Sequence, residues 1–431
     1  MEEGLTLKIT VVGLGYIGLP TAIMFANHGQ HVYGMDVNEL VLGKLRKGRI
    51  HIEEPGLQAE LDKALQSNHF HVGTEAEAAD AFIVSVPTPN NMDTYKSCNL
   101  DYVKSAVETI LPVMEKGNTL IVESTIAPRS MEDHIKPMIE AEGFVVGKDI
   151  FLVHCPERVL PGQVIHELIH NNRIIGGMTE ACTQAGKAIY SIFVQGELIE
   201  TSASEAEMSK LMENTFRDVN IALANELVKV CDELDINALH VIEMANKHPR
   251  VNLHTPGPGV GGHCLAVDPY FIAAEAPSVS PLIQTARAIN STMPTFIVKK
   301  VEQWTKHKEK AKIAVLGLTY KGDIDDIRES PALDIYQTLE SNPAYSVKAF
   351  DPHVKAPFVE NNLDQTVDQA DVVLILTDHS EFKALEPSDF HLAKNAVILD
   401  TKAIATNCKT MENYYDLGNI SKSNEKELLH I

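Results

Sequence analysis

Cys264 stands where a cysteine can act as a nucleophile. Residues 255–271 around it hold four glycines and three prolines, a composition that excludes a helix interior or a regular central strand. We expect a loop whose backbone comes very close to a ligand. Because the thiolate form of cysteine is nucleophilic, Cys264 is a candidate for covalent catalysis, and Asp268 follows it by four residues. The alternative is a buried, inert thiol beside a tight turn.

A row of hydrogen-bond donors lies on a long predicted helix. Residues 204–234 contain neither Gly nor Pro, and a serine at 202 or 204 can cap the start. Lys210, Asn214 and Arg217 are spaced i, i+4 and i+7, so they share one face. With no acid among them, the row suits an anionic or oxygen-rich ligand, and an ordinary solvated face is the alternative. Apolar spacing predicts the buried face: Met208, Leu211, Met212, Thr215, Val219 and Ala222.

Four further charged residues are candidates for the substrate pocket. Glu157 and Arg158 follow a predicted strand at 150–154. In an open parallel sheet, ligands bind at the carboxyl ends of the strands, so this pair is placed for substrate chemistry. His248 and Arg250 come just before the glycine-rich loop, and we expect them to line the same pocket. Simple surface exposure is the alternative for Arg250.

The first 36 residues carry a dinucleotide-binding signature. A predicted strand at 8–12 runs into a G-x-G-x-x-G turn, a helix, a second strand and an acid. The glycines permit a tight turn, a close approach of the pyrophosphate to the helix start, and close helix–strand packing. The acid accepts hydrogen bonds from a ribose diol and repels a 2′-phosphate, so NAD is favoured over NADP. The cofactor-binding candidates are Gly13, Gly15, Tyr16, Ile17, Gly18 and Asp36.

Two threonines stand at the ends of the next strands. Residues 81–86 and 119–122 are apolar runs, followed by Thr88 and Thr125. Both hydroxyls are candidates for contacts to the cofactor or to a catalytic water. For either threonine taken alone, a helix-capping or turn hydroxyl is the favoured alternative.

The C-terminal third repeats the α/β plan. Strands are predicted at 312–316, 347–351, 371–376 and 396–400, and Ser330 with Pro331 marks a helix start with serine as the N-cap. The turn after the first of these strands lacks a full G-x-G-x-x-G, but Lys321 and Arg328 stand where a phosphate would lie. We expect a nucleotide other than the redox cofactor to bind here. The alternative is a degenerate, purely structural duplicate. The residues from Ile420 onward are expected to form a mobile tail.

Bulk properties limit the class of protein. The chain has 431 residues and a net charge of −22, which disfavours nucleic acid and anionic membranes as partners. No apolar run is long enough to cross a membrane. The acidic N-terminus is no signal peptide, and six widely spaced cysteines fit reduced thiols in a cytoplasmic enzyme. A metal site is not expected from the histidine spacing.

The predicted fold class is α/β. It has two Rossmann-like, doubly wound domains joined by a central helical domain with one long helix. The expected boundaries are 1–200 for the NAD-binding domain, 201–298 for the helical domain with the cysteine loop, and 299–431 for the second nucleotide-binding domain.

These features together resemble the UDP-glucose/GDP-mannose dehydrogenase family of NAD-dependent nucleotide-sugar 6-dehydrogenases. The resemblance covers nearly the whole chain in order and rests on its motifs: 13–20, 156–157, Lys210, Asn214, 261–264 with Asp268, and 321–328. Segments 155–163, 216–222, 248–252 and 256–264 are most similar to members that act on UDP-N-acetyl-D-mannosamine. Members that act on UDP-N-acetylglucosamine usually carry Glu-Asp-Pro-Gly-Asn where this chain has Val-Leu-Pro-Gly-Gln at 159–163, and they are the alternative.

The resemblance implies oxidation of a sugar C6 alcohol to a carboxylate, with two NAD reduced per sugar. In the implied mechanism, the Cys264 thiolate adds to the aldehyde, and the thiohemiacetal becomes a thioester that water hydrolyses. Lys210 is implied as proton acceptor and oxyanion stabiliser, and Asn214 as a hydrogen-bond donor to the same oxygen. The resemblance implies that Glu157 and Asp268 lie near the water and act in general-base catalysis, and that Thr125 holds the water. Whether Lys210 or Glu157 is the first base stays open.

The remaining roles also follow from the resemblance. It implies that the sugar and its acetamido group are bound by six residues: Arg158, Val159, Arg217, His248, Arg250 and Gly261. It also implies that Tyr320 and Lys321 bind the UDP moiety and that Arg328 contacts the cofactor. The resemblance further implies a homodimer or higher homo-oligomer and a place in polysaccharide biosynthesis.

Two other classes of function stay open. One is a two-electron, hydroxyacid-type NAD dehydrogenase in which Lys210 and Asn214 are catalytic and Cys264 only packs. The other is a nucleotide-sensing regulator that has kept the fold, against which the set of Lys210, Asn214, Cys264 and Asp268 argues.

Overall fold

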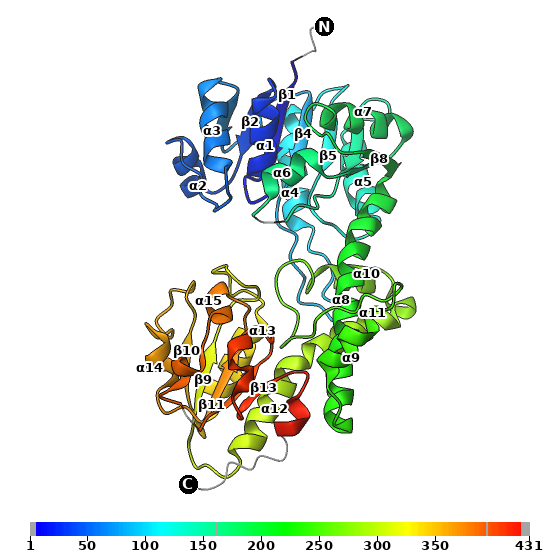
Figure 1. Cartoon of the computed structure of the whole chain (residues 1–431). Helices are drawn as coiled ribbons and strands as arrows, with labels where there is room; N and C mark the ends of the chain where they lie inside the picture. The colour runs from blue at the N-terminus through cyan, green and yellow to red at the C-terminus, as the bar shows by residue number, and fades with distance from the viewer. Residues whose placement is uncertain (1–5, 161, 394, 424–431) are drawn as a thin grey trace. The chain divides into compact units, whose positions relative to one another are not determined.

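The computed structural model in Figure 1 describes residues 6–160, 162–393 and 395–423. The chain forms two compact units. The first unit is Met1–Glu213 with Tyr270–Pro277, and the second is Asn214–Pro269 with Ser278–Ile431. The expected division into three domains at residues 200 and 298 stays a prediction.

An eight-stranded sheet forms the centre of the first unit, in the order β3-β2-β1-β4-β5-β6-β7-β8. Strands β1 to β6 pair in parallel, and β7 pairs antiparallel with β6. Growth in both directions from β1 is typical of a doubly wound nucleotide-binding domain. The strands are β1 (Lys8–Val12), β2 (His31–Met35), β3 (Phe70–Gly73), β4 (Ala81–Val84), β5 (Thr119–Val122), β6 (Phe151–His154), β7 (Arg173–Gly177) and β8 (Leu198–Ser202).

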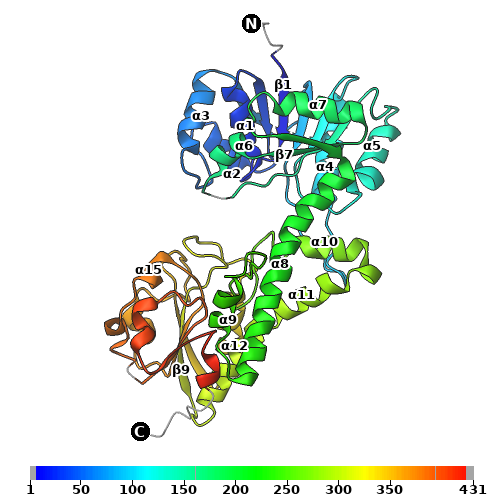
Figure 2. The ribbon, with the colours of Figure 1, turned by 45° about the vertical axis from the view of Figure 1, so that its right-hand side comes forward.

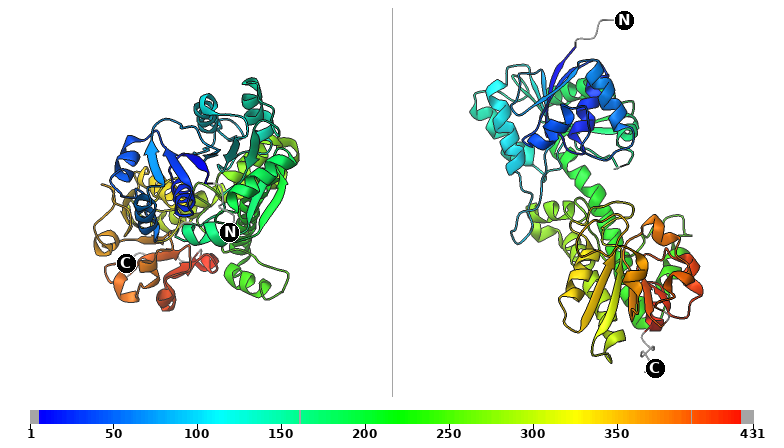
Figure 3. Two further views of the ribbon diagram at one scale, coloured as in Figure 1. Left: turned by 90° about the horizontal axis from the view of Figure 1, so that it is seen from above. Right: turned by 90° about the vertical axis from the view of Figure 1, so that its left-hand side faces the viewer.

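Helices cover both faces of this sheet, as the right-hand view of Figure 3 shows. Strand β4 therefore sends Ala81 and Ile83 into one buried cluster and Phe82 and Val84 into another. Burial on both faces explains why these strands read as continuous apolar runs. The helices are α1 (Gly18–Asn27), α2 (Glu39–Leu45), α3 (Leu57–Gln66), α4 (Asp101–Ile110), α5 (Lys136–Ala141), α6 (Val164–His170) and α7 (Glu180–Tyr190), with short turns η1 (Leu111–Val113) and η2 (Met131–Ile135).

A five-stranded parallel sheet forms the second unit, in the order β10-β9-β11-β12-β13. The strands are β9 (Ala311–Leu316), β10 (Tyr345–Phe350), β11 (Val372–Ile375), β12 (Val397–Asp400) and β13 (Tyr414–Asp416). The first four confirm the predicted strands, and β13 was not predicted. The α/β fold class with two Rossmann-like sheets and a helical central region is therefore confirmed.

Helices also cover both faces of the second sheet. Residues of α8 (Ala203–Leu234), α12 (Met293–Thr305) and α13 (Pro331–Glu340) share one buried cluster with it. Residues of α14 (Leu363–Val367) and α15 (Ser380–Lys383) pack on the opposite cluster. The remaining helices are α9 (Ala238–Ala245), α10 (Asp268–Glu275) and α11 (Pro281–Ser291), with short turns η3 (Pro277–Val279), η4 (Pro387–Phe390), η5 (Thr406–Thr410) and η6 (Ile420–Ser423).

Helix α8 is a single helix of 32 residues (Figure 2). Ser202 caps its start, because the Ser202 hydroxyl accepts from the Glu205 amide at 3.4 Å and the Glu205 carboxylate accepts from the Ser202 amide at 3.1 Å. The predicted helix is confirmed, but its predicted buried face is wrong in part. Met208 and Met212 are 37% and 45% exposed. Leu211, Thr215 and Ala222 are buried as predicted. The buried side also holds four polar residues that were not predicted there: Glu207, Asn214, Asp218 and Asn225.

Two local expectations about the second unit fail. Helix α13 begins at Pro331 as predicted, but the buried Ser330 hydroxyl makes no hydrogen bond within the described residues. The Ser330 hydroxyl therefore does not cap the helix. The mobile tail was expected from Ile420, whereas η6 is folded and Ile420 and Ser423 are buried. The rest of that expected tail lies outside the described residues.

Candidate active site

The glycine-rich turn after β1 forms an open cradle. The Gly13 amide donates to the Met35 carbonyl at 2.8 Å, and the Leu14 amide donates to Asp36 Oδ2 at 2.9 Å. Gly13 has φ +93°, and a Cβ at Gly18 would lie 1.9 Å from the Gly13 carbonyl oxygen. Both positions therefore require glycine.

Gly15 differs from its two neighbouring glycines, because nothing lies within 4 Å of where its Cβ would be. This exposed position leaves room for an anionic group at the start of α1, where backbone N–H groups face outward. Tyr16 is 51% exposed, and Ile17 immediately precedes α1. The half-buried Asp36 stands beside this turn at the end of β2. The arrangement fits the pyrophosphate and ribose of a dinucleotide.

Thr88 and Thr125 join the loops that follow β4 and β5. The Thr88 hydroxyl donates to the Thr125 carbonyl oxygen at 2.6 Å. This bond matches the alternative of a turn hydroxyl for Thr88. Thr125 is half-buried at the same sheet edge as the glycine-rich turn.

Glu157 lies in a buried ion cluster that the sequence did not reveal. Its carboxylate pairs with Arg173, which also contacts Glu123 at 3.2 Å. The Tyr190 hydroxyl donates to Glu123 at 2.6 Å, and Arg173 Nε lies 3.2 Å from the Cys155 sulfur. One guanidinium therefore serves two carboxylates away from water. The only signal in the sequence was a basic residue at the head of the apolar strand β7.

Burial dominates the titration of this cluster. It raises the pKa of Glu123 to about 7, against the lowering effect of Arg173. Burial likewise raises the pKa of the Cys155 thiol to about 12, so Cys155 is an inert thiol.

Arg158 and Val159 lie beside this cluster with other contacts. Arg158 Nη1 donates to Glu213 Oε1 of α8 at 2.7 Å, and its other nitrogen donates to the Asn172 carbonyl. Val159 is half-buried against the core of the first unit.

Asn214 links the cysteine loop to α8 within the second unit. Its Nδ2 donates to Asp268 Oδ2 at 2.5 Å, and its Oδ1 accepts from Arg217. The Asp268 amide donates to the Cys264 carbonyl at 2.9 Å, and Cys264 is exposed whereas Asp268 is 3% exposed. The thiol therefore stands on a turn that Asn214 and Asp268 hold. The side chain of Lys210, one turn earlier on α8, makes no hydrogen bond or ion pair with any described residue.

A second buried chain of hydrogen bonds holds the start of the same loop. Asn225 Oδ1 accepts from the Gly257 amide at 2.9 Å, and Asn225 Nδ2 donates to Asn290 at 2.9 Å. Asn290 donates to Asp218 at 2.8 Å, and Arg287 pairs with the same carboxylate at 2.6 Å. This network explains the polar buried side of α8, because the loop needs partners for its backbone.

The loop glycines allow a close approach to the segment after β9. A Cβ at Gly261 would lie 2.2 Å from the Glu329 carbonyl oxygen. A Cβ at Gly262, where φ is +84°, would lie 2.7 Å from the Tyr320 ring. The space that these glycines leave is thus taken, in part, by Glu329 and Tyr320. His248 and Arg250 are exposed residues before the loop.

The turn after β9 repeats the hydrogen bonds of the first turn but is closed. The Gly317 amide donates to Phe350 at 2.9 Å and the Leu318 amide to Asp351 Oδ2 at 2.7 Å. Thr319, in the place of Gly15, is 2% exposed, and its hydroxyl donates to the Lys321 carbonyl at 2.8 Å.

The two predicted phosphate ligands of the second unit differ in their surroundings. The Lys321 side chain is exposed. Arg328 is paired with Asp326 through two bonds of 2.8 and 2.9 Å, which offsets its charge.

Lys402 is a further cation that the sequence reading missed. It follows β12, and its amine would lie 3.4 Å from a Cβ at Gly257 of the cysteine loop. Burial lowers the pKa of the Lys402 amine, against the raising effects of Asp378 and Asp400. The sequence did contain a signal for it: Lys402 follows a predicted parallel strand, at the edge where ligands bind.

Comparison with known proteins identifies the family of the chain. Residues 7–194 match the model of the UDP-glucose/GDP-mannose dehydrogenase family NAD binding domain, residues 204–292 its central domain, and residues 314–407 its UDP binding domain. The chain belongs to this family. NAD is therefore its cofactor, as the glycine-rich turn predicted, and the expected family resemblance is confirmed.

Individual relatives are similar over nearly their whole length. The UDP-N-acetyl-D-mannosamine dehydrogenase of Methanococcus maripaludis is 46% identical over 406 residues, 92% of this chain and 93% of that one. The structure of the UDP-N-acetyl-mannosamine dehydrogenase Cap5O from S. aureus is 59% identical, with a TM-score of 0.90, covering 96% of this chain and 100% of that one. An NDP-N-acetyl-D-galactosaminuronic acid dehydrogenase of Ralstonia nicotianae is 42% identical, covering 92% and 96%. The chain is thus an NAD-dependent nucleotide-sugar dehydrogenase.

A search for membrane-spanning helices among the described residues gave none that combines sufficient length with sufficient hydropathy.

Proposed function

We propose that the protein oxidises the C6 alcohol of UDP-N-acetyl-D-mannosamine to the carboxylate, giving UDP-N-acetyl-D-mannosaminuronate. The observation that carries the proposal is full-length similarity, at 46% and 59% identity, to two UDP-N-acetyl-mannosamine dehydrogenases. An exposed cysteine on a loop held by Asn214 and Asp268 supports the chemistry. The balanced reaction consumes one sugar nucleotide, one water and two NAD, and yields one carboxylate, two NADH and three protons.

NAD supplies a hydride acceptor for each of the two oxidations. The turn with Gly13, Gly15 and Gly18 would hold its pyrophosphate, and Asp36 its ribose. We assign the flanking cofactor contacts to Tyr16, Ile17, Thr88, Thr125 and Arg328. Because Asp326 pairs with Arg328, a cofactor contact by Arg328 requires that this pair rearrange.

Cys264 is assigned as the nucleophile. Its thiolate adds to the aldehyde carbon to form a thiohemiacetal, whose oxidation leaves a thioester on the same sulfur. Lys210 is assigned to take the proton of the C6 hydroxyl and then to stabilise the oxyanion. No described residue is a hydrogen-bond or ion-pair partner of its side-chain nitrogen, which supports this role.

Asn214 donates to the oxyanion in this proposal. Its Nδ2 carries two hydrogens, of which one goes to Asp268, so the second remains for the substrate. Asp268 thereby orients the amide, and as a buried carboxylate it can also act as a base toward water.

Hydrolysis of the thioester needs a positioned water. Glu157 is assigned to this step together with Thr125, and Arg173 holds the Glu157 carboxylate in place. Because the Glu157 carboxylate is already paired with Arg173, this geometry favours Lys210 over Glu157 as the first base.

The substrate contacts are assigned from the resemblance to the family. For the UDP moiety, exposed Lys321 provides a charge for phosphate, and Tyr320 lies against Gly262. The sugar and its acetamido group are assigned to Arg158, Val159, Arg217, His248, Arg250 and Gly261. Arg158 and Arg217 already bond to Glu213 and Asn214, so both would share their nitrogens with the substrate.

The exposed face of α8 supports a homodimer. Its exposed apolar side chains recur every four or seven residues, as in a helix that packs against another protein surface: Met208, Met212, Phe216, Leu223, Val230 and Leu234. We propose that two copies of the chain pair through this face, in the cytoplasm, within polysaccharide biosynthesis. Leu223→Glu is expected to give a monomer by light scattering; an unchanged dimer would place the interface elsewhere.

One assay tests the proposed substrate. The wild-type protein is given NAD with, in parallel, UDP-ManNAc, UDP-GlcNAc, UDP-GalNAc, UDP-glucose or GDP-mannose, and Cys264→Ala serves as the control for acid formation. We expect kcat/KM for UDP-ManNAc to exceed each of the others by about 10-fold or more. A higher kcat/KM for UDP-GlcNAc or UDP-GalNAc would identify that sugar nucleotide as the substrate instead.

A further inference from the structure

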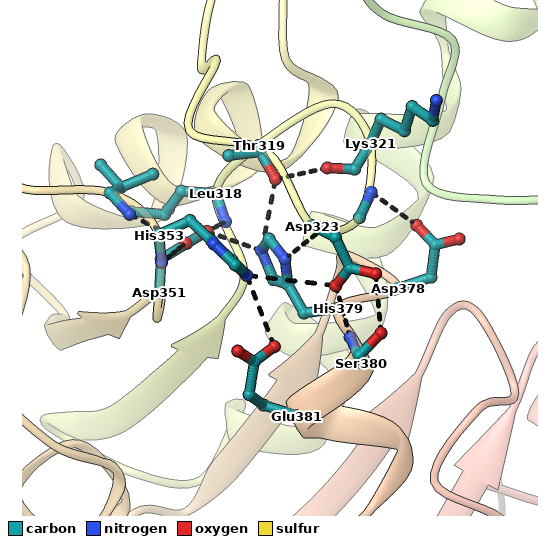
Figure 4. Close-up of polar contacts among 12 residues, drawn as sticks. Leu318, Thr319, Lys321, Asp323, Asp351, His353, Asp378, His379, Ser380 and Glu381 are labelled. Atoms are coloured by element: carbon teal, nitrogen blue, oxygen red, sulfur yellow. Dashed lines mark hydrogen bonds and ion pairs between the residues drawn. The ribbon is translucent and has the colours of Figure 1, made fainter. Parts of the chain in front are cut away.

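A cluster of metal-ligating side chains lies beyond the carboxyl ends of β9, β10 and β11 in the second unit (Figure 4). Asp323 comes from the loop after β9, His353 from the loop after β10, and Glu381 from α15, which follows β11. Together with His379, these residues offer ligand atoms that all lie within 4.8 Å of one another. From this cluster we infer that Asp323, His353 and Glu381 bind a divalent cation of the zinc class.

The distances within the cluster fit ligands around a cation better than direct hydrogen bonds. His353 Nε2 lies 3.4 Å from Glu381 Oε2 and 4.0 Å from Asp323 Oδ1. Hydrogen bonds of this kind are usually about 2.7–3.2 Å long. Tetrahedral zinc with bonds of about 2.0–2.1 Å separates neighbouring ligand atoms by roughly 3.3–3.4 Å. The separation of His353 from Glu381 has this length.

The imidazole nitrogen itself has the properties of a ligand. His353 Nε2 is shielded from solvent and makes no hydrogen bond to any residue that the structure describes. A buried nitrogen without a hydrogen bond is costly, and a cation between it and the two carboxylates would remove that cost. Figure 4 shows His353, Asp323 and Glu381 facing one another.

A buried pair behind the cluster fixes the backbone of two ligands. Asp351 Oδ1 accepts from the His353 amide at 2.9 Å, and Asp351 Oδ2 lies 3.0 Å from His379 Nε2. His379 Nδ1 accepts from the Asp323 amide at 3.0 Å. Both nitrogens of His379 are thus engaged, so His379 is a positioning residue rather than a ligand. Such second-shell order is typical of metal sites.

The charge of the cluster suits a divalent cation. Asp323 accepts from the Ser380 hydroxyl and amide, each at 2.7 Å, which hold its carboxylate in place. Two carboxylates and one neutral imidazole carry a charge of −2, and mixed O and N ligands accept zinc and its neighbours in the series. Asp323 and Glu381 are 49% and 51% exposed at their side chains, so an ion and its water ligands can enter from solvent.

The site has a structural consequence for the loop that precedes it. Asp323 follows Lys321 by two residues, and a cation that ties Asp323 to the loops after β10 and β11 would fix the conformation of residues 319–323. Cation binding here does not depend on which sugar nucleotide the protein oxidises.

Zinc titration of the untagged full chain tests the inference. After treatment with a chelator, the protein is titrated calorimetrically with ZnCl₂ and, in parallel, with CoCl₂ under an absorption spectrometer. We expect one cation per chain and a cobalt spectrum without a thiolate charge-transfer band, since the ligands are oxygen and nitrogen. Binding should also raise the melting temperature by mass action.

Three variants locate the bound ion. His353→Ala and Glu381→Gln should each weaken zinc binding at least about 10-fold, while His391→Ala, which removes an exposed histidine elsewhere in the same unit, should leave it unchanged. Circular dichroism verifies that each variant is folded. Three outcomes would overturn the inference: zinc affinity in His353→Ala equal to that of the wild type, a thiolate band in the cobalt spectrum, or no zinc binding by the wild type. His353 and Glu381 would then be an ordinary ion pair rather than metal ligands.

Discussion

The two sheets of the protein begin with the same construction and use it differently. In both, a glycine amide after the first strand donates to the end of the second strand, and the next amide donates to an acid that follows it. The distances are 2.8 and 2.9 Å for Gly13 and Leu14, and 2.9 and 2.7 Å for Gly317 and Leu318. The two turns differ at their third residue. Gly15 is open, whereas Thr319 is 2% exposed.

The acids at the ends of the two second strands differ in the same way. Asp36 is half-buried beside the open turn. Asp351 is 3% exposed and bonded to His379. One acid is therefore available to a ribose, and the other has become part of the core. The second unit thus has the same backbone hydrogen bonds at this turn as the first unit, without an open position for a ligand.

The largest expected effect is on stability, at the buried acid. Asp351→Ala leaves the Leu318, His353 and Val354 amides and the His379 ring without their acceptor. Removing one partner of such a pair costs about 3–5 kcal/mol. Urea unfolding should show this loss while the dissociation constant for NAD stays at the wild-type value. A tenfold weaker NAD complex would show that the second unit also serves the cofactor.

The next effect concerns the open turn. Gly15→Ala should fold normally, because a methyl group at Gly15 has nothing within 4 Å, but it should obstruct the pyrophosphate. We expect a roughly 10- to 100-fold weaker NAD complex, or about 1.4–2.7 kcal/mol, by fluorescence titration. The matched variant Thr319→Ala should leave NAD binding unchanged. Equal NAD affinity in Gly15→Ala and wild type would show that the cofactor lies elsewhere.

Asp36→Ala should have a smaller effect on cofactor choice. Loss of the ribose contact should weaken NAD binding about 10-fold, or ~1.4 kcal/mol, and loss of the negative charge should narrow the preference over NADP. Since Asp36 is only half-buried, the cost in stability should be well below that of Asp351→Ala. The ratio of kcat/KM for NAD and NADP measures the change, and a ratio equal to that of the wild type would contradict the assignment.

The smallest effect is a difference in pH dependence between two buried acids. Burial raises the pKa of Glu123 to about 7, so the folded protein holds this proton more tightly and loses stability as the pH rises from about 4.5 to 7. For Asp351, burial raises the pKa, but the bonds from His379 and Leu318 outweigh it and leave the pKa lowered. Its contribution is present above the ordinary value and is lost only in acid.

Glu123→Gln separates the two responses. The variant should reduce the fall of the melting temperature between pH 5 and pH 7, by roughly 2–4 °C for each kcal/mol. Glu207, whose pKa burial also raises to about 7, keeps the rest of the slope. Asp351→Asn should keep the wild-type slope in this window. A slope in Glu123→Gln equal to that of the wild type would assign the pH dependence to other groups.

Local signals predicted the frame of both sheets. The strands, the turn at Gly13 and the helix from residue 204 follow from runs, glycines and caps that lie within a few residues of each other. Two features did not follow. The closed state of Thr319 depends on His379, sixty residues away. Met208 and Met212 were predicted to be buried by their spacing, but the loop around Gly257 needs polar partners, so α8 turns Asn214 and Asn225 inward instead.

The candidate site shows the same limit. Cys264, Asp268 and Asn214 were identified by residue type and spacing, and the structure brings them together through the bond from Asn214 to Asp268. Arg173 and Glu123 were missed, because Arg173 pairs with both Glu123 and Glu157 across segments that are far apart in the sequence. Lys402 was missed for the same reason.

The central claim is a four-electron oxidation through Cys264. Its most direct test is the number of NADH formed per UDP-ManNAc consumed, with the product identified by mass spectrometry. The account predicts two NADH and a uronate. One NADH per sugar, with a carbonyl product, would contradict it and leave a two-electron dehydrogenase in which Cys264 has no covalent role.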